Sequence, residues 1–153
     1  MTRHTAYYVK SGRMETALVH RPIAWLVRRG ITLNGKSELA VRGRTSGEWR
    51  TVPVNPLPLG GHRYLVAPRG TTQWVRNLRA AGGGELRVGR RAEPFTAVEI
   101  TDEEKPAVLH AYLDRWGREV GRFFDGVGAG SPPEELRRIA PRHPVFRITP
   151  IPA

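Results

Sequence analysis

Short segments in which apolar and polar residues alternate recur through the middle and the end of the chain, separated by turns rich in glycine and proline. This alternation predicts strands, because successive side chains of a strand point to opposite faces of a sheet. The predicted strands cover residues 37–43, 49–59, 62–68, 85–89, 91–100 and 143–149. Pro53, Pro56 and Pro58 restrict at least the second half of the 49–59 strand to a sheet edge or a bulge, since proline has no N–H to donate.

Helical spacing of apolar residues appears in the segments between these strands. Residues 72–81 are predicted to form a helix that three consecutive glycines end. A longer helix is predicted from Thr101 to about Phe124, because it opens with the spacing of a capping box. A short helix is expected to begin within residues 131–134, after a flexible glycine-rich loop. The apolar face of the long helix consists of Val108, Leu109, Tyr112, Leu113 and Trp116.

The N-terminal part of the chain is expected to contain a flexible tail, residues 1–13, and a helix from Met14 to Arg29. We interpret this helix as packed over the sheet. The alternative is an amphipathic helix in peripheral contact with a membrane, because arginines line its rim. Neither a repeat nor a linker divides residues 14–153, so they are expected to form one α+β domain around a mostly antiparallel sheet or small barrel.

Composition narrows the possible functions. The 153 residues carry a net charge of +11, and 22 of the 25 basic residues are arginine. Arginine binds carboxylates and phosphates with two parallel hydrogen bonds, so the charge indicates an anionic partner. There is no cysteine, which excludes disulfides and thiol chemistry and fits a reducing cytoplasm. The chain shows no 18-residue apolar run and no signal-peptide core, so it is expected to be neither membrane-spanning nor secreted.

The segment from Gly43 to Arg50 carries the first chemical signal. Arg44 and Arg50 lie on opposite sides of a Thr45-Ser46-Gly47-Glu48 turn, so a hairpin would bring the two guanidinium groups together. Two like charges held close, beside hydroxyl and backbone N–H groups, are typical of an anion site. The alternative is a basic surface hairpin without a ligand.

A second signal lies where the 62–68 strand ends and the 72–81 helix begins. Arg69 and Gly70 place a third guanidinium beside a helix N-terminus, where unpaired N–H groups and the helix dipole favour anions. Trp74 and Asn77 are three residues apart and share one helical face. With the two hairpin arginines, these residues suit a ligand that has an anionic tail and a planar head.

This set of residues resembles the deazaflavin (F420)-dependent nitroreductase family, whose members are small actinobacterial proteins with a split β-barrel fold. The resemblance covers about two-thirds of the chain. Its elements are Gly43-Arg44-x-Ser46-Gly47-x-x-Arg50, Pro53, the strand Tyr64-Leu65-Val66-Ala67, and Trp74-x-x-Asn77-Leu78-Arg79.

The resemblance implies an F420-dependent oxidoreductase, similar to nitroreductases or quinone reductases, that transfers a hydride to a small organic acceptor without a required catalytic side chain. It also implies a cytoplasmic homodimer. Pro53 belongs to the motif that the resemblance assigns to the coenzyme. Arg44, Thr45, Ser46 and Arg50 would hold its phosphate or carboxylates. The remaining coenzyme residues that it implies are Ala67, Pro68, Arg69 and Gly70 on one side and Trp74 and Asn77 on the other.

Other functions remain open at this point. A relative with the same barrel that binds flavin mononucleotide (FMN) is the nearest alternative. A basic module that binds nucleic acid or another anion without catalysis is the second, although the aromatic residues do not alternate with arginine as a stacking surface does. The five histidines lack ligand spacing, so no metal site is expected. Carboxylates are sparse near the basic segments, which does not favour a hydrolase.

Overall fold

A computed structural model describes residues 37–152, and the predicted tail and N-terminal helix lie outside them. The described strands form one antiparallel sheet in the order β2-β1-β5-β6-β7-β4-β3. All the pairings are antiparallel and helices flank the sheet, so the α+β class and the mostly antiparallel sheet are confirmed. The strands are β1 (Ser37–Arg42), β2 (Trp49–Val54), β3 (Leu57–Leu59), β4 (His62–Val66), β5 (Gly83–Val88), β6 (Arg91–Glu99) and β7 (Val145–Pro150).

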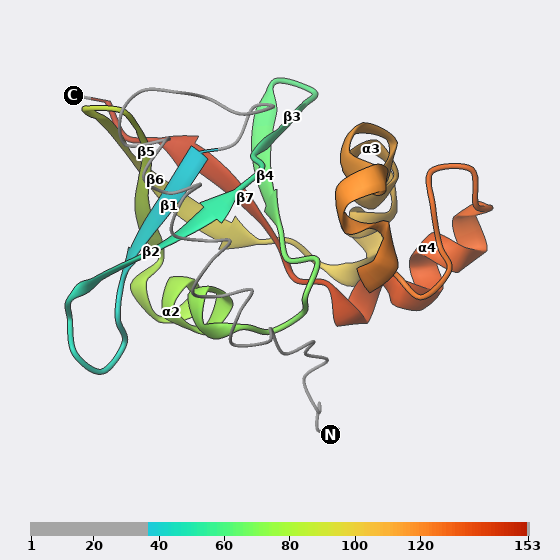
Figure 1. The fold of residues 1–153 in the computed structure, drawn as a ribbon, viewed down its shortest axis with the longest axis horizontal. Coiled ribbons are helices and arrows are strands. Elements are labelled where there is room, and N and C mark those ends of the chain that lie inside the picture. The colour runs from blue at the N-terminus through green and yellow to red at the C-terminus, as the bar shows by residue number, and fades with distance from the viewer. Residues whose placement is uncertain (1–36, 153) are drawn as a thin grey trace.

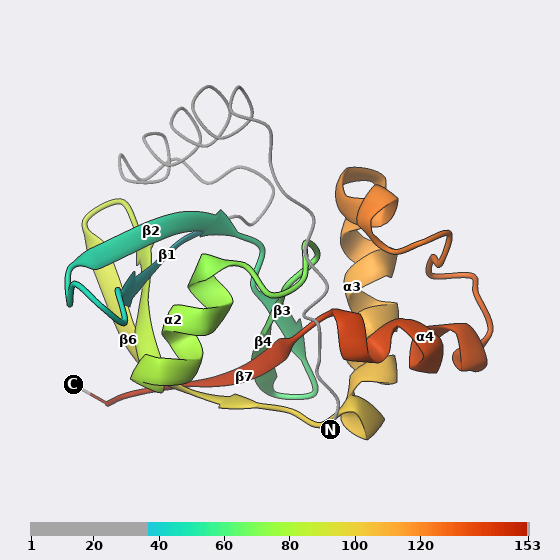
Figure 2. The same ribbon diagram turned by 90° about the horizontal axis from the view of Figure 1, so that it is seen from below.

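The sheet curls around one helix and carries the other helices on its flank. Figure 2 shows α2 inside the curve, between β2 and β7, whereas α3 and α4 lie together beside β3 and β4 (Figures 1 and 2). We call α3, α4 and the short turns around them the helical lobe. The helices are α2 (Gln73–Ala81), α3 (Lys105–Val120) and α4 (Pro133–Ile139), and the 3₁₀ turns are η2 (Asp102–Glu104), η3 (Gly121–Phe123) and η4 (Ala140–Arg142).

The predicted continuous strand over 49–59 is wrong, because the chain forms two strands there. β2 and β3 lie at opposite edges of the sheet. Asn55 and Pro56 separate them, and the two strands pair with different neighbours, β2 with β1 and β3 with β4. Pro53 and Pro58 lie in the two edge strands, where the lost donor costs least. The edge position expected from the prolines is therefore confirmed.

The three glycines after α2 have different roles, and only Gly82 ends the helix. Its φ is 73°, and its N–H bonds the Leu78 carbonyl at 2.8 Å. Gly83 and Gly84 instead begin β5, two residues earlier than predicted. A Cβ on Gly84 would lie 2.5 Å from the Ala40 carbonyl oxygen, and one on Gly83 would collide with the Phe95 carbonyl oxygen. These glycines allow neighbouring strands to approach closely.

Two hydrophobic cores lie on opposite faces of β4 and β7. Leu65 and Phe146 pack in the core that α2 closes, and we call it the barrel core. The next residue of β4, Val66, and the residue that precedes Phe146, Val145, pack against the helical lobe. Because neighbouring residues of one strand face opposite sides, β4 and β7 belong to both cores. The end of β4 therefore lies between α2 and the helical lobe.

The start of α3 follows the predicted pattern. The Thr101 N–H donates to Glu104 Oε1 at 2.9 Å, as in a capping box, and the predicted apolar face is buried. The regular helix ends at Val120, and a 3₁₀ turn continues to Phe123. The buried Lys105 joins this helix to the end of α4, because its ammonium donates to the Ala140 carbonyl at 2.8 Å.

His143 connects the start of β7 to the end of β4. Its ring is buried, stacks on Phe124 with centroids 4.1 Å apart, and has Nδ1 3.0 Å from the Ala67 carbonyl oxygen. Burial lowers the pKa of His143 to about 4, and the positive charges of Lys105 and Arg142 act in the same direction, while the bond to Ala67 opposes them. The imidazole is therefore neutral in the folded protein at pH 7.

We expect Gly84→Ala to reduce the free energy of unfolding by about 1–3 kcal/mol, because its methyl group would force the β5 and β1 backbones apart. Gly117→Ala is the matched control, since nothing lies within 4 Å of a Cβ there. Within helix α3 that change should be neutral or stabilise by up to about 1 kcal/mol. Urea unfolding measures both variants, and equal effects would contradict the close-approach explanation.

We expect stability to fall between pH 6.5 and pH 4 because of His143. In this range the unfolded chain binds a proton at an ordinary imidazole of pKa about 6.5, while the folded protein does not. Between pH 7 and 4.5 the loss should be about 2–3 kcal/mol. His143→Gln keeps a donor for the Ala67 carbonyl and cannot titrate, so this part of the pH dependence should disappear. An unchanged slope in urea unfolding at the two pH values would refute the assignment.

Candidate functional site

The turn between β1 and β2 is closed by its own hydrogen bonds. The Gly43 N–H donates to the Glu48 carbonyl at 2.7 Å, and the Gly47 N–H donates to the Gly43 carbonyl at 2.9 Å. The Glu48 N–H donates to Ser46 Oγ at 3.1 Å. Arg42, the last residue of β1, donates from Nη1 to the Gly47 carbonyl at 3.1 Å. The turn predicted from the sequence therefore forms, although several of its N–H groups are already used inside it.

Arg44 fixes this turn to helix α2. Its backbone N–H donates to Asn77 Oδ1 at 3.1 Å, and its Nη1 donates to the same oxygen at 2.8 Å. Nη1 also lies 2.8 Å from Gln73 Oε1, one helical turn earlier. Asn77 is 5% exposed, so its amide is a buried anchor, whereas Arg44 remains exposed. The guanidinium is thus held in one place and still faces solvent.

Arg50 lies on the same face of the sheet as α2. It is paired with Val41, and side chains directly opposite each other on neighbouring strands share a face. Val41 packs in the barrel core that α2 closes. The Arg50 Nε atom lies 3.6 Å from the position of a Cβ on Gly43, next to Arg44 in the chain. Hence both predicted hairpin arginines lie at the turn, on the α2 side.

The other predicted hairpin residues divide between the two faces. Ser46 lies over Gly43, since its Oγ is 2.8 Å from the position of a Cβ there. Thr45 is exposed in the turn. Pro53 pairs with Glu38, while its neighbours Val52 and Val54 contribute to the barrel core. By strand alternation, Pro53 points to the face opposite α2, away from the side on which Arg44 and Arg50 lie.

The end of β4 leads into α2 through a fixed turn over Ala67, Pro68, Arg69 and Gly70. The Ala67 N–H donates to the Pro144 carbonyl at 2.9 Å, and the Gly70 N–H donates to the Ala67 carbonyl at 3.2 Å. Gly70 has a φ of 84°, which strongly favours glycine. The backbone of this segment is therefore held in one conformation before any ligand binds.

Arg69 contacts the helical lobe. Its guanidinium carbon lies 5.7 Å from the centre of the Phe123 ring in η3, within cation–π range. The structure thus brings Arg44, Arg50 and Asn77 together and holds Arg69 against Phe123.

The N-terminus of α2 fits an anion. Thr72 is its N-cap residue in an extended conformation, but its hydroxyl makes no capping bond. Its Oγ1 is buried without a hydrogen-bond partner among the described residues. The first turn carries no acidic residue to offset the helix dipole. Together with Arg44, which bonds the first residue of α2, this donor set suits an anionic group such as a phosphate or carboxylate.

Trp74 contributes to the barrel core. Its ring centroid lies 6.1 Å from that of Phe146, and it is one of the partly buried residues packed on this core. Asn77 points instead at the Arg44 turn. Gln73 was missed by the sequence analysis, although its position four residues before Asn77 places both amides on one side of the helix.

Two expectations about other sites fall partly outside the described residues. Over residues 37–152, no three His, Asp or Glu side chains are grouped so that they could hold a metal ion. The helices of this same region are too short or too polar to cross a bilayer.

We expect Asn77→Ala to reduce the free energy of unfolding by about 1–3 kcal/mol, because it removes the buried acceptor of two bonds from Arg44. Gln73→Ala is the control. It removes one exposed contact to the same guanidinium and should change stability by less than about 0.5 kcal/mol. Urea unfolding compares the variants, and a larger loss for Gln73→Ala would show that Asn77 is not the anchor.

The solved structures similar to this chain share its fold. One described as a domain-swapped dimer is 18% identical, with a TM-score of 0.56, over 88% of this chain and 98% of that chain. An F420-H2 dependent reductase, FDR-A, is 20% identical, with a TM-score of 0.52, over 75% and 94%. A protein of unknown function from Agrobacterium tumefaciens str. C58 is 15% identical, with a TM-score of 0.53, over 93% and 57%. At these identities the likeness concerns the fold, which is the expected α+β split barrel.

A search of curated proteins found no match to the sequence. The model of the F420H(2)-dependent quinone reductase family matches residues 13–119, which include β1 to β6, α2 and almost all of α3. This range contains the hairpin arginines, the end of β4 and the start of α2. Because it covers well over half of the chain, the protein belongs to the F420H2-dependent quinone reductase family, a family of oxidoreductases.

Proposed function

We propose that this protein binds reduced F420 and directs its hydride to a quinone-like or nitroaromatic acceptor, with Arg44 and Arg50 holding the anionic tail of the coenzyme. Family membership supports the coenzyme class. The observation that carries the site assignment is the fixed position of Arg44, which bonds two amide oxygens of α2 next to Arg50.

The partners of Arg44 suit an anion site because they are neutral. Amide oxygens of Gln73 and Asn77 orient the guanidinium but leave its charge in place. Elsewhere in the described chain, several arginines are paired with carboxylates and so have less charge to offer a ligand. These pairs are Arg63–Glu93, Arg79–Glu99, Arg87–Glu85, Arg138–Glu135 and Arg142–Asp125.

The end of β4 would hold the remainder of the coenzyme. Ala67, Pro68 and Gly70 form a fixed backbone turn that a planar ring could approach, and Arg69 adds a cation beside it. When bound, F420H2 supplies the hydride, so the protein needs only to bind, orient and exclude water. The contributions of Thr45, Ser46, Pro53 and Trp74 remain predictions.

The proposal also covers the oligomeric state of the protein and the ligands that compete with F420. We expect a homodimer in the cytoplasm, and one solved structure with this fold is described as a domain-swapped dimer. FMN is the competing cofactor. Nucleic acid is the competing non-enzymatic ligand, because a net charge of +11 attracts any polyanion.

We expect F420 to bind with a dissociation constant in the micromolar range or below, about −8 kcal/mol or better. Fluorescence quenching of F420 at two ionic strengths measures it, with FMN and duplex DNA as comparison ligands. F420 should remain bound at salt that removes DNA, because the ring adds contacts that salt does not screen. Tight DNA binding without any response to F420 or FMN would refute the oxidoreductase proposal.

We expect Arg44→Ala to weaken F420 binding at least about tenfold, the usual loss for a hydrogen bond to a charged group. Arg137→Ala is the matched control, since it removes the same charge from an exposed position on α4. Its dissociation constant should stay within about twofold of the parent, as expected for a distant surface charge. Equal losses in the two variants would indicate attraction by net charge rather than a site.

With F420H2 present, menadione and a nitroimidazole then test the two acceptor classes.

A further inference from the structure

Two arginine guanidinium groups lie over the ring of Phe123. Arg69, from the end of β4, lies 5.7 Å from its ring centre, and Arg122 lies 4.7 Å from the same centre. Arg69 and Phe123 are both half-buried, whereas Arg122 is exposed. Arg69 is one of the residues that the proposed function assigns to the coenzyme, while Phe123 belongs to the helical lobe. The contact therefore joins the candidate site to an element that the site does not otherwise use.

This contact is one of several that link the turn after β4 to the helical lobe and the start of β7. Phe124, which follows Phe123, is fully buried and stacks on His143. His143 Nδ1 lies 3.0 Å from the carbonyl oxygen of Ala67, two residues before Arg69. Because the His143 ring and Phe124 are buried, these contacts hold the chain beside Phe123 against the segment that leads to Arg69.

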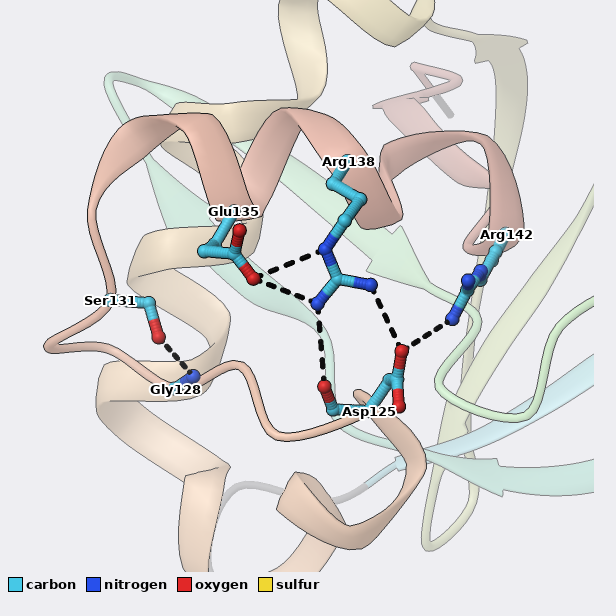
Figure 3. Close-up of polar contacts among 6 residues, drawn as sticks. All are labelled: Asp125, Gly128, Ser131, Glu135, Arg138 and Arg142. Atoms are coloured by element: carbon cyan, nitrogen blue, oxygen red, sulfur yellow. Dashed lines mark hydrogen bonds and ion pairs between the residues drawn. The ribbon is translucent and has the colours of Figure 1, made fainter.

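The chain after Phe124 is fixed as well, as Figure 3 shows. Asp125 has a φ of 50°, and its carboxylate accepts from Arg138 Nη1 at 2.9 Å and from Arg142 Nη1 at 3.0 Å. Hydrogen bonds from Arg138 and then Arg142 hold the pKa of Asp125 below its usual range. Arg138 also bonds Glu135 at 2.8 Å. These contacts tie the start of the 125–130 loop to α4 and η4.

We propose that Phe123 is a positioning residue that sets where the Arg69 guanidinium lies and thereby tunes the affinity of the coenzyme. This inference rests on the proposed function. An aromatic face attracts a cation without contributing a full negative charge, so this contact orients Arg69 without neutralising it. A carboxylate at the same place would orient the arginine and also compete with the ligand. The Phe123 ring thus connects the helical lobe to the site.

The test is a double-mutant cycle on the dissociation constant of F420, measured by fluorescence quenching. We expect Arg69→Ala to weaken binding more than Phe123→Leu, whose expected loss is about two- to fivefold, the usual range for an exposed cation–π contact. In the Arg69→Ala background, Phe123→Leu should have no further effect, because the group that it positions is gone. Phe123→Tyr keeps an aromatic face and should restore parental affinity. Arg137→Ala again controls for net charge.

The outcomes separate the inference from the function on which it rests. If Arg69→Ala weakens binding but Phe123→Leu changes nothing or tightens binding, the positioning role is refuted while the proposed function stands. Equal effects of Phe123→Leu with and without Arg69 would also refute it, because they indicate a general packing loss. If the parent protein does not bind F420, the proposed function fails, and the positioning role falls with it. Thermal melting of each variant confirms that the compared proteins are folded.

Discussion

The burial of both faces of β4 and β7 is the constraint on which the candidate site depends. Leu65 and Phe146 face the barrel core, while Val66 and Val145 face the helical lobe. A strand with two buried faces cannot slip by one residue, because a slip would exchange the two sets of side chains. The end of β4 is therefore fixed in register, and the turn that begins at Ala67 starts from a rigid position.

The arginines of this fold differ in whether their partners are charged carboxylates or neutral groups. Carboxylates pair with arginines between β4 and β6, between α2 and β6 and in the helical lobe, as in Arg63–Glu93, Arg79–Glu99 and Arg138–Glu135. Arg44 is held instead by amide oxygens, and Arg69 lies on an aromatic ring. A net charge of +11 explains attraction to polyanions in general. The neutral amide partners of Arg44 explain how a particular anion could be selected there.

Local signals in the sequence predicted most of the fold. The capping box at Thr101 and the glycine at the end of α2 each depend on a few neighbouring residues, and each forms as expected. The errors arose where distant segments decide. β2 and β3 separate because they pair with different strands, and Gly83 and Gly84 join β5 because other backbones approach them closely. A single sequence carries no direct signal for either event.

The candidate site shows the same division. Spacing alone predicted that Arg44 and Arg50 would meet at a hairpin turn. Alternation along β2 also places Pro53 on the face opposite Arg50, a signal that the assignment of Pro53 by resemblance did not use. The contact between Arg69 and Phe123 joins the turn after β4 to η3, and no local pattern indicates it.

The candidate site depends on two separate hydrophobic cores, so substitutions can affect its two halves separately. Arg44, Asn77 and Gln73 are held by the hairpin and α2, which belong to the barrel core. Arg69 depends in addition on Phe123, whose neighbours pack in the other core. Substitutions at separate, weakly coupled positions have nearly additive effects. A substitution in the helical lobe can therefore change the surroundings of Arg69 while the bonds between Arg44 and α2 stay intact. The two halves of the candidate site can thus change independently.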